Sequence, residues 1–121
     1  MKKVLLGSLE SAIMEVIWAR GAVSVRDVLG ALKMKKKVAY TTAMTVMNRL
    51  VDKRILVRKP DKNAFEYRAA KSKEAFHADA SKHVIDTLIA ECGDVAIVQF
   101  MDRIGKVDPE LKARLKKLID S

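Results

Sequence analysis

The spacing of apolar residues changes twice along the chain, and this change limits the folds open to it. Apolar residues recur at helical spacing up to about Lys53, alternate with polar residues over 55–59 and 65–69, and return to helical spacing from Ser72. The alternating segments flank Pro60-Asp61-Lys62-Asn63, a composition typical of a β-hairpin turn. The sequence therefore predicts a mostly α fold with one small β-hairpin.

Three short helices are expected before the hairpin. They span about Ser8–Ala19, Ser24–Leu32 and Ala39–Lys53, with Ser8 and Ser24 as N-caps and Gly21 closing the first. The third helix has an apolar face that consists of Ala39, Ala43, Val46, Met47 and Leu50. Three helices followed by a hairpin with a basic tip predict a winged helix-turn-helix, in which the third helix enters the major groove of DNA and the hairpin is the wing.

Three further helices are expected after the hairpin. The first runs from Ser72 to Cys92, the second runs from Asp94 and stops at Gly105, and the third begins at Asp108 with a proline in its first turn. Their apolar faces are too broad for a core of about 50 residues alone, so we expect them to pack against a second copy of the chain. The predicted interface residues are Phe76, Ala80, Val84, Leu88, Val98, Met101, Leu111, Leu115 and Leu118.

Charge divides the chain at the same place. Residues 1–71 hold 16 Lys and Arg against 6 Asp and Glu, whereas residues 72–121 hold 8 against 9. A basic half of this kind favours a polyanionic partner. We therefore expect two domains, a winged-helix DNA-binding domain over 1–71 and a three-helix dimerisation region over 72–121, with duplex DNA and a second copy as partners.

The polar face of the third helix is the candidate site for reading bases. Threonine methyls suit the methyl group of thymine, and asparagine can bond adenine through two hydrogen bonds. The candidate base-reading residues are Thr41, Thr42, Thr45 and Asn48. The candidate phosphate contacts are Tyr40, Arg49, Lys35, Lys36, Lys37, Arg58, Lys62, Asn63 and Arg68. The alternative is that these residues form an ordinary solvated surface.

Other chemistry finds little support in the sequence. One cysteine, Cys92, excludes an intramolecular disulfide and a cysteine-rich metal site, and the two histidines are too far apart for one helix face. There is no glycine-rich phosphate loop, so we expect no enzyme, metal or cofactor. The apolar run in Met1–Leu6 is too short for a signal peptide, and no run is long enough for a membrane span, so we expect a cytoplasmic protein without a membrane partner.

Several segments resemble the penicillinase-repressor family. These are Leu6-Gly7-Ser8-Leu9-Glu10, Val16-Ile17-Trp18, the segment from Ala39 to Leu50, and the wing segment Ala64-Phe65-Glu66-Tyr67-Arg68. The resemblance implies a homodimer on a palindromic operator that represses resistance or stress genes, antibiotic resistance among them. It also implies relief of repression when a regulatory protease cuts the dimerisation region.

In that family the cut precedes a phenylalanine on the middle C-terminal helix, and the matching bond here is Gln99–Phe100, with Gln where the family more often has Asn. Arg54 stands where the family often has glycine, and it would be strained if the position needs a positive φ. Two other functions stay open at this point, an RNA- or ribosome-associated basic module and a winged-helix adaptor for protein partners.

Overall fold

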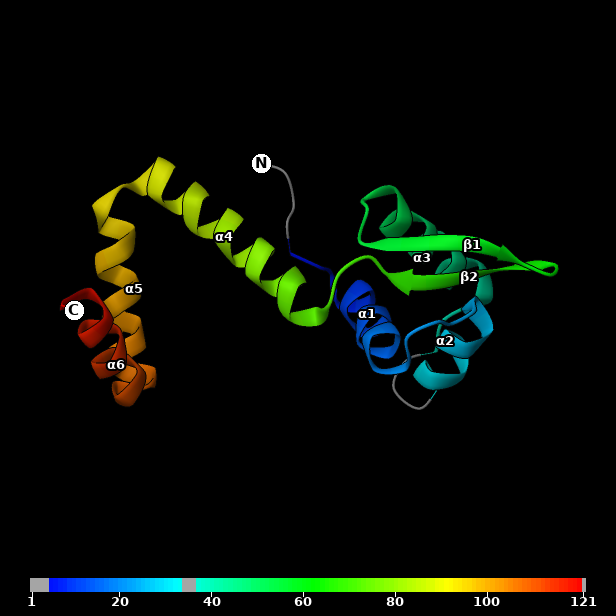
Figure 1. Ribbon diagram of the computed structural model, residues 1–121, viewed down its shortest axis with the longest axis horizontal. Coiled ribbons are helices and arrows are strands. Elements are labelled where there is room, and N and C mark those ends of the chain that lie inside the picture. The colour runs from blue at the N-terminus through cyan, green and yellow to red at the C-terminus, as the bar shows by residue number, and fades with distance from the viewer. Residues whose placement is uncertain (1–4, 34–36, 121) are drawn as a thin grey trace. The chain divides into compact units, whose positions relative to one another are not determined.

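The computed structural model describes residues 5–33 and 37–120, and their order of elements confirms the predicted fold class. The described chain forms six helices and one two-stranded antiparallel hairpin (Figure 1). The elements are α1 (Ser8–Arg20), α2 (Val25–Leu32), α3 (Tyr40–Asp52), β1 (Leu56–Asp61), β2 (Ala64–Ala69), α4 (Lys73–Cys92), α5 (Asp94–Val107) and α6 (Pro109–Asp120).

The chain divides into two compact units, one ending at Ala80 and the other beginning at Ser81. The first unit holds α1 to α3, the hairpin and the first residues of α4. The second unit holds the rest of α4 with α5 and α6. A helix therefore joins the two units, and no loop separates them at this point.

Local side chains set where the first two helices begin. The N-cap of α1 is Gly7, whose backbone N–H donates to Glu10 Oε1 at 3.0 Å. The prediction of Ser8 as N-cap was therefore wrong by one residue, because Gly7 keeps the extended backbone of an N-cap and Ser8 is already the first helical residue. Ser24 caps α2 as predicted: its Oγ accepts from the Asp27 N–H at 3.1 Å, and Asp27 Oδ2 accepts from the Ser24 N–H at 2.9 Å. That backbone hydrogen bond, more than the serine hydroxyl, lowers the pKa of Asp27.

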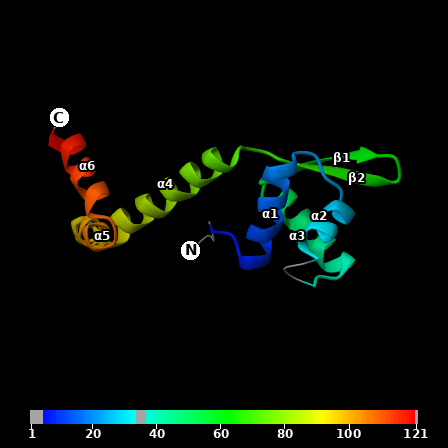
Figure 2. The same cartoon turned by 90° about the horizontal axis from the view of Figure 1, so that it is seen from below.

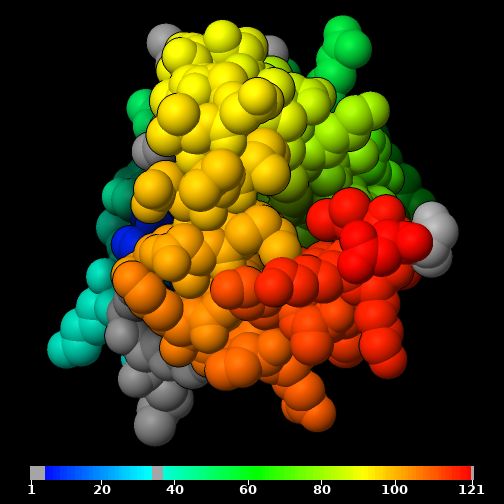
Figure 3. All heavy atoms as spheres, turned by 90° about the vertical axis from the view of Figure 1, so that its left-hand side faces the viewer, coloured from blue at the N-terminus to red at the C-terminus, as the bar shows by residue number. Residues whose placement is uncertain are grey.

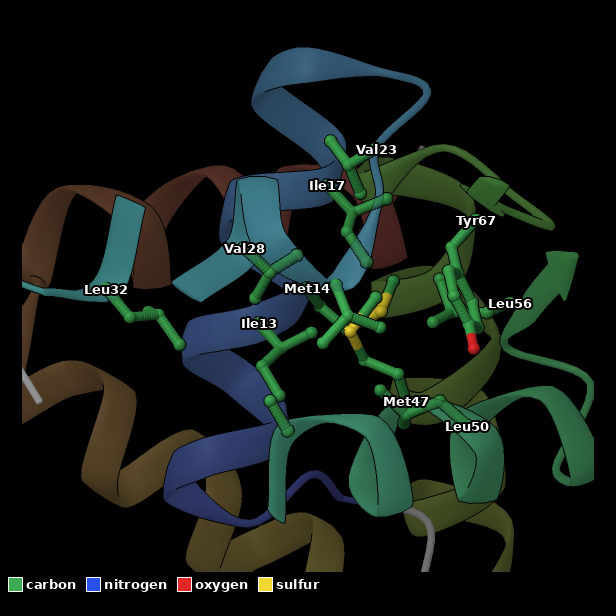
Figure 4. Close-up of a cluster of buried hydrophobic side chains, with 12 residues drawn as sticks. Ile13, Met14, Ile17, Val23, Val28, Leu32, Met47, Leu50, Leu56 and Tyr67 are labelled. Carbon is green, nitrogen blue, oxygen red and sulfur yellow. The ribbon is translucent and has the colours of Figure 1, made fainter. Parts of the chain in front are cut away.

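One apolar core holds α1, α2, α3 and the hairpin together, with side chains from all of them meeting in Figure 4. Complete burial of each large aliphatic side chain contributes about 1.5–3 kcal/mol. The buried residues are Ile13, Met14, Ile17, Val23, Val25, Val28, Leu32, Ala43, Met47, Leu50, Leu56 and Tyr67. Two residues of the predicted α3 face differ: Ala39 is exposed because it lies at the N-cap, and Val46 is half-buried.

The hairpin extends away from the three helices in both views (Figures 1 and 2). Its strands pair from Leu56 with Ala69 to Asp61 with Ala64, so only Lys62 and Asn63 form the turn. Lys62 has φ 57°, which fits the first central position of a two-residue hairpin turn.

A bridge connects the base of the hairpin to the loop between α1 and α2. The Val23 N–H donates to the Tyr67 carbonyl at 3.0 Å, and the Tyr67 N–H donates to the Val23 carbonyl at 2.7 Å. The wing is thereby bonded to the helical part through its backbone as well as packed on it.

The second unit has elements near those predicted but no buried core of its own. The helix expected to stop at Gly105 continues to Val107, because an isolated glycine within a helical pattern is tolerated and does not by itself end the helix. Figure 3 shows α5 and α6 side by side. Asp108 Oδ1 caps α6 by accepting from the Leu111 N–H at 3.0 Å. No described residue of α4, α5 or α6 is fully buried.

Arg54 occupies the left-handed region, with φ 64°, directly after the C-cap of α3. The left-handed region costs a non-glycine residue about 1–2 kcal/mol, and glycine loses part of that gain to its own chain entropy. We therefore expect Arg54→Gly to stabilise the protein by up to about 1 kcal/mol, or a few degrees in melting temperature. Thermal unfolding measures the change. Arg54→Ala is the matched control, because it removes the same side chain and keeps the strain; an equal gain in both variants would contradict the argument.

Candidate nucleic-acid interface

One face of α3 is fixed on the core while the other is exposed. Ala43, Met47 and Leu50 are fully buried, so the helix cannot rotate without loss of packing. The exposed side of the helix carries five of the six predicted site residues of α3. The five exposed residues are Tyr40, Thr41, Thr42, Thr45 and Arg49. The structure therefore brings the predicted threonine face together on a rigid support.

The N-terminal end of α3 has electrostatics suited to an anion. It has no side-chain cap and no acidic residue in its first turn, so its backbone N–H groups and the positive end of the helix dipole face outward. Lys37 is exposed just before this end. Lys35 and Lys36 lie outside the described residues.

Arg26 on α2 adds a positive charge at this end of α3, and sequence reasoning missed it. Its guanidinium carbon lies 5.9 Å from the centroid of the Tyr40 ring, within the range of a cation–π interaction. The two residues lie on the two packed helices of the helix-turn-helix. Arg26 does not belong to a run of basic residues in the sequence. Its place beside the N-terminal end of α3 therefore becomes visible only from the packing of α2 on α3.

Asn48 is half-buried, and its side chain bonds the wing. Its Oδ1 accepts one hydrogen bond from Arg58 Nη1 at 2.7 Å and another from the Tyr67 hydroxyl at 2.8 Å. Tyr67 is only 2% exposed and is part of the core. Adenine recognition by asparagine requires this same oxygen. The expected base-reading role of Asn48 stays a prediction, and the intramolecular bonds compete with it.

The two faces of the wing differ in charge. On one face, Arg58 lies over the ring of Phe65, with 4.5 Å between its guanidinium carbon and the ring centroid. On the other face, Glu66 Oε1 lies 2.9 Å from Arg68 Nε and 3.5 Å from Lys59 Nζ. The hydrogen bond from Arg68 is the main reason why the pKa of Glu66 is lowered.

The predicted phosphate contacts of the wing differ in whether they already form an ion pair within the chain. Arg68 already has an anionic partner within the chain. Lys62 and Asn63 lie exposed at the turn, and the ion pairs of Glu66 with Lys59 and Arg68 in the described wing do not include Lys62. The tip is therefore the part of the wing best placed to contact a phosphate.

Trp18 joins α1 to the beginning of α4. Its Nε1 donates to the Lys71 carbonyl at 3.1 Å, and its ring centroid lies 5.5 Å from that of Phe76. The predicted interface residue Phe76 thus has a partner in its own chain. These contacts give Trp18 a packing role, although the side chain is only half-buried.

The other predicted interface residues retain exposed apolar surface. Leu88, Val98 and Leu118 are exposed, and the remaining members are half-buried: Ala80, Val84, Met101, Leu111 and Leu115. Gln99 and Phe100 of the predicted cleavage bond are both exposed on α5.

Over 5–33 and 37–120, no group of three or more His, Cys, Asp or Glu side chains is placed to hold a metal ion. Within the same ranges, no helix combines the length and the apolar character that crossing a membrane would require.

A helix-turn-helix whose second helix exposes a polar face, followed by a hairpin bonded to it, defines a winged-helix DNA-binding protein. The sequence profile of the penicillinase repressor family matches residues 6–121, and the protein belongs to this family. Transcriptional regulator BlaI of Mycobacterium tuberculosis, in both strains compared, is 34% identical over 106 residues, which cover 83% of this chain and 74% of that protein. The predicted resemblance is confirmed, and the chain is a transcriptional repressor of the BlaI kind, not an enzyme.

Two solved structures confirm the fold. The solution structure of the DNA-binding domain of the repressor BlaI has a TM-score of 0.52 and 24% identity, and the match covers 60% of this chain and 90% of that one. The Bacillus licheniformis BlaI monomeric form in complex with the blaP half-operator has a TM-score of 0.50 and 24% identity, covering 61% of this chain and 92% of that one.

Two residues of α3 are expected to differ in what they contribute to DNA binding. Thr45→Ala should reduce the preference for the best sequence over its single-base variants about three- to tenfold, because Thr45 is predicted to contact a base edge. Arg49→Ala should weaken binding to all sequences alike and reduce the salt slope by about one, because Arg49 is predicted to contact a phosphate. Competition binding against a panel of duplexes measures both effects. Lys117→Ala, which removes an exposed charge from α6, is the control and should change neither; loss of sequence preference in the Arg49 variant would contradict the assignment.

Proposed function

We propose that the protein is a homodimeric repressor that acts in the cytoplasm and binds a palindromic operator in duplex DNA. In this proposal α3 lies in the major groove and the tip of the wing contacts the adjacent backbone. The single observation that carries the proposal is the exposed threonine face of α3, held by a buried stripe and flanked by cationic side chains. The half-operator complex of the Bacillus licheniformis relative supports it by analogy.

Selection of bound sequences from random duplex DNA tests the proposal. We expect a pseudo-palindrome, because a two-fold symmetric dimer presents two copies of α3. If each protomer neutralises about four phosphates, log K should fall against log salt with a slope of order −7. A flat salt titration would exclude an interface built on phosphates. Binding of structured RNA at least as tight as that of the selected duplex would favour the basic RNA module instead.

The second copy is proposed to cover the apolar surface of α4, α5 and α6. Large apolar side chains there are 44–75% exposed in the single chain. Exposed apolar surface of this extent is typical of a site of association with another protein. The side chains in question are Ile85, Leu88, Ile89, Val95, Ile97, Val98, Phe100, Val107, Leu118 and Ile119. A dimer would also place two DNA-binding units on the two half-sites of one operator.

Truncation tests the division of labour between the two units. A chain ending at Ala80 keeps the contact between Trp18 and Phe76, whereas one ending at Ala70 loses it. We expect the Ala80 truncation to be a folded monomer with weak operator affinity, and the Ala70 truncation to be the less stable of the two. Sedimentation and thermal unfolding measure these properties. A full-length chain that sediments as a monomer at micromolar concentration would rule out the dimer.

Proteolysis is the proposed route of induction. A cut at Gln99–Phe100 would divide α5 into pieces too short to be stable helices in water, so both fragments should lose the dimer surface. The first unit would survive as a weakly binding monomer. Mass spectrometry of the protein from induced host cells is the measurement, and we expect a fragment that ends at Gln99. Intact protein that has left the operator would instead indicate control by a ligand or by synthesis.

A further inference from the structure

Asn48 lies on the recognition helix, but its contacts lie within the chain. We propose that Asn48 is a positioning residue, which fixes the angle between the wing and α3, and that it does not read a base. The proposal rests on the proposed function in one respect, since α3 and the wing are taken to bind one duplex. The link between Asn48 and the wing is a property of the protein alone and can be measured without DNA.

The hydrogen-bonding capacity of the Asn48 oxygen is the first argument. A side-chain carbonyl has two lone pairs, and Oδ1 already accepts from Arg58 Nη1 at 2.7 Å and from the Tyr67 hydroxyl at 2.8 Å. An adenine amino group would have to displace one of these donors. If the Tyr67 hydroxyl were displaced, it would need a new acceptor in place of the Asn48 oxygen. Tyr67 is 2% exposed, so water could not easily take that place.

The position of the two donors is the second argument. Arg58 and Tyr67 are cross-strand partners in the hairpin, so a single oxygen on α3 holds both strands at the same level. Arg58 is held from its other side by the Phe65 ring at 4.5 Å. A wing held in this way loses less conformational freedom when it meets DNA, and this raises affinity without any contact between Asn48 and a base.

The first test is a double-mutant cycle on the full-length chain without DNA. Asn48→Ala and Tyr67→Phe each remove one side of the same hydrogen bond, and Tyr67→Phe leaves the ring in the core. We expect the double variant to be less destabilised than the sum of the single variants, with a coupling of about three- to tenfold in the unfolding equilibrium constant. Asn48→Asp should retain the stability of the parent chain, because a carboxylate accepts from the same two donors. Additive effects would overturn the proposal.

The second test measures binding of the selected operator and of each of its single-base variants. We expect Asn48→Ala and Tyr67→Phe to weaken binding to every sequence by a similar factor, about three- to tenfold, with the order of preference unchanged. Arg68→Gln is the matched control, since it removes a wing cation from the opposite face and should show no coupling to Asn48→Ala. A changed preference at one base position in Asn48→Ala, absent in Tyr67→Phe, would restore the base-reading role.

The two tests separate the two possible failures. If the parent chain shows no sequence-specific DNA binding, the proposed function fails, and the cycle without DNA still decides whether Asn48 holds the wing. If Asn48→Ala does not fold, Tyr67→Phe and Asn48→Asp decide, because neither leaves a cavity: loss of stability in the first and its retention in the second support the positioning role, and the reverse result overturns it.

Discussion

A buried tyrosine on the hairpin needs polar partners, and the arrangement of the DNA-binding unit depends on how that need is met. An unsatisfied buried polar group costs about 1–3 kcal/mol. The backbone N–H and C=O of Tyr67 form hydrogen bonds with Val23 in the loop before α2, and its hydroxyl donates to Asn48 of α3. Its ring lies in the core. One residue therefore connects the loop, the wing and the recognition helix, so that none of the three can move without breaking bonds to the others.

Local patterns in the sequence predicted most of this fold. The helices, the hairpin and the buried and exposed faces of α3 follow from spacing, because burial of an amphipathic face needs no knowledge of its partner. The contacts of Asn48 with Arg58 and Tyr67, and that of Arg26 with Tyr40, could not be predicted, since they join separate elements. The same limit explains why a role for Asn48 in base reading was the natural expectation.

The second unit obeys a different constraint. The break between α4 and α5 at Gly93, with φ 64°, and the Asp108 cap at the start of α6 lie where the sequence predicts, so local chemistry defines these two positions well. Gly105 was an exception, because a helix can continue through an isolated glycine at a modest cost in stability. Yet none of the described residues in α4 to α6 is buried. In the proposed dimer, these helices with broad apolar faces would take their stability from the second copy, and association and folding of this unit would then be one process.

The charges of the wing show how affinity and specificity can be separated within one small element. Glu66 pairs with Lys59 and Arg68 on the outer face of the wing, which is the face opposite Arg58 and Phe65. This pairing reduces the attraction of the outer face for any polyanion. Arg58 is held on the inner face by Phe65 and by α3, so its charge has a fixed position. A duplex that fits this arrangement gains from a preorganised cation, whereas a poorly fitting one gains little from the outer face. In the proposed complex, the pairing inside the wing would therefore favour correctly docked DNA over non-specific attraction, as a repressor that must find few sites among many requires.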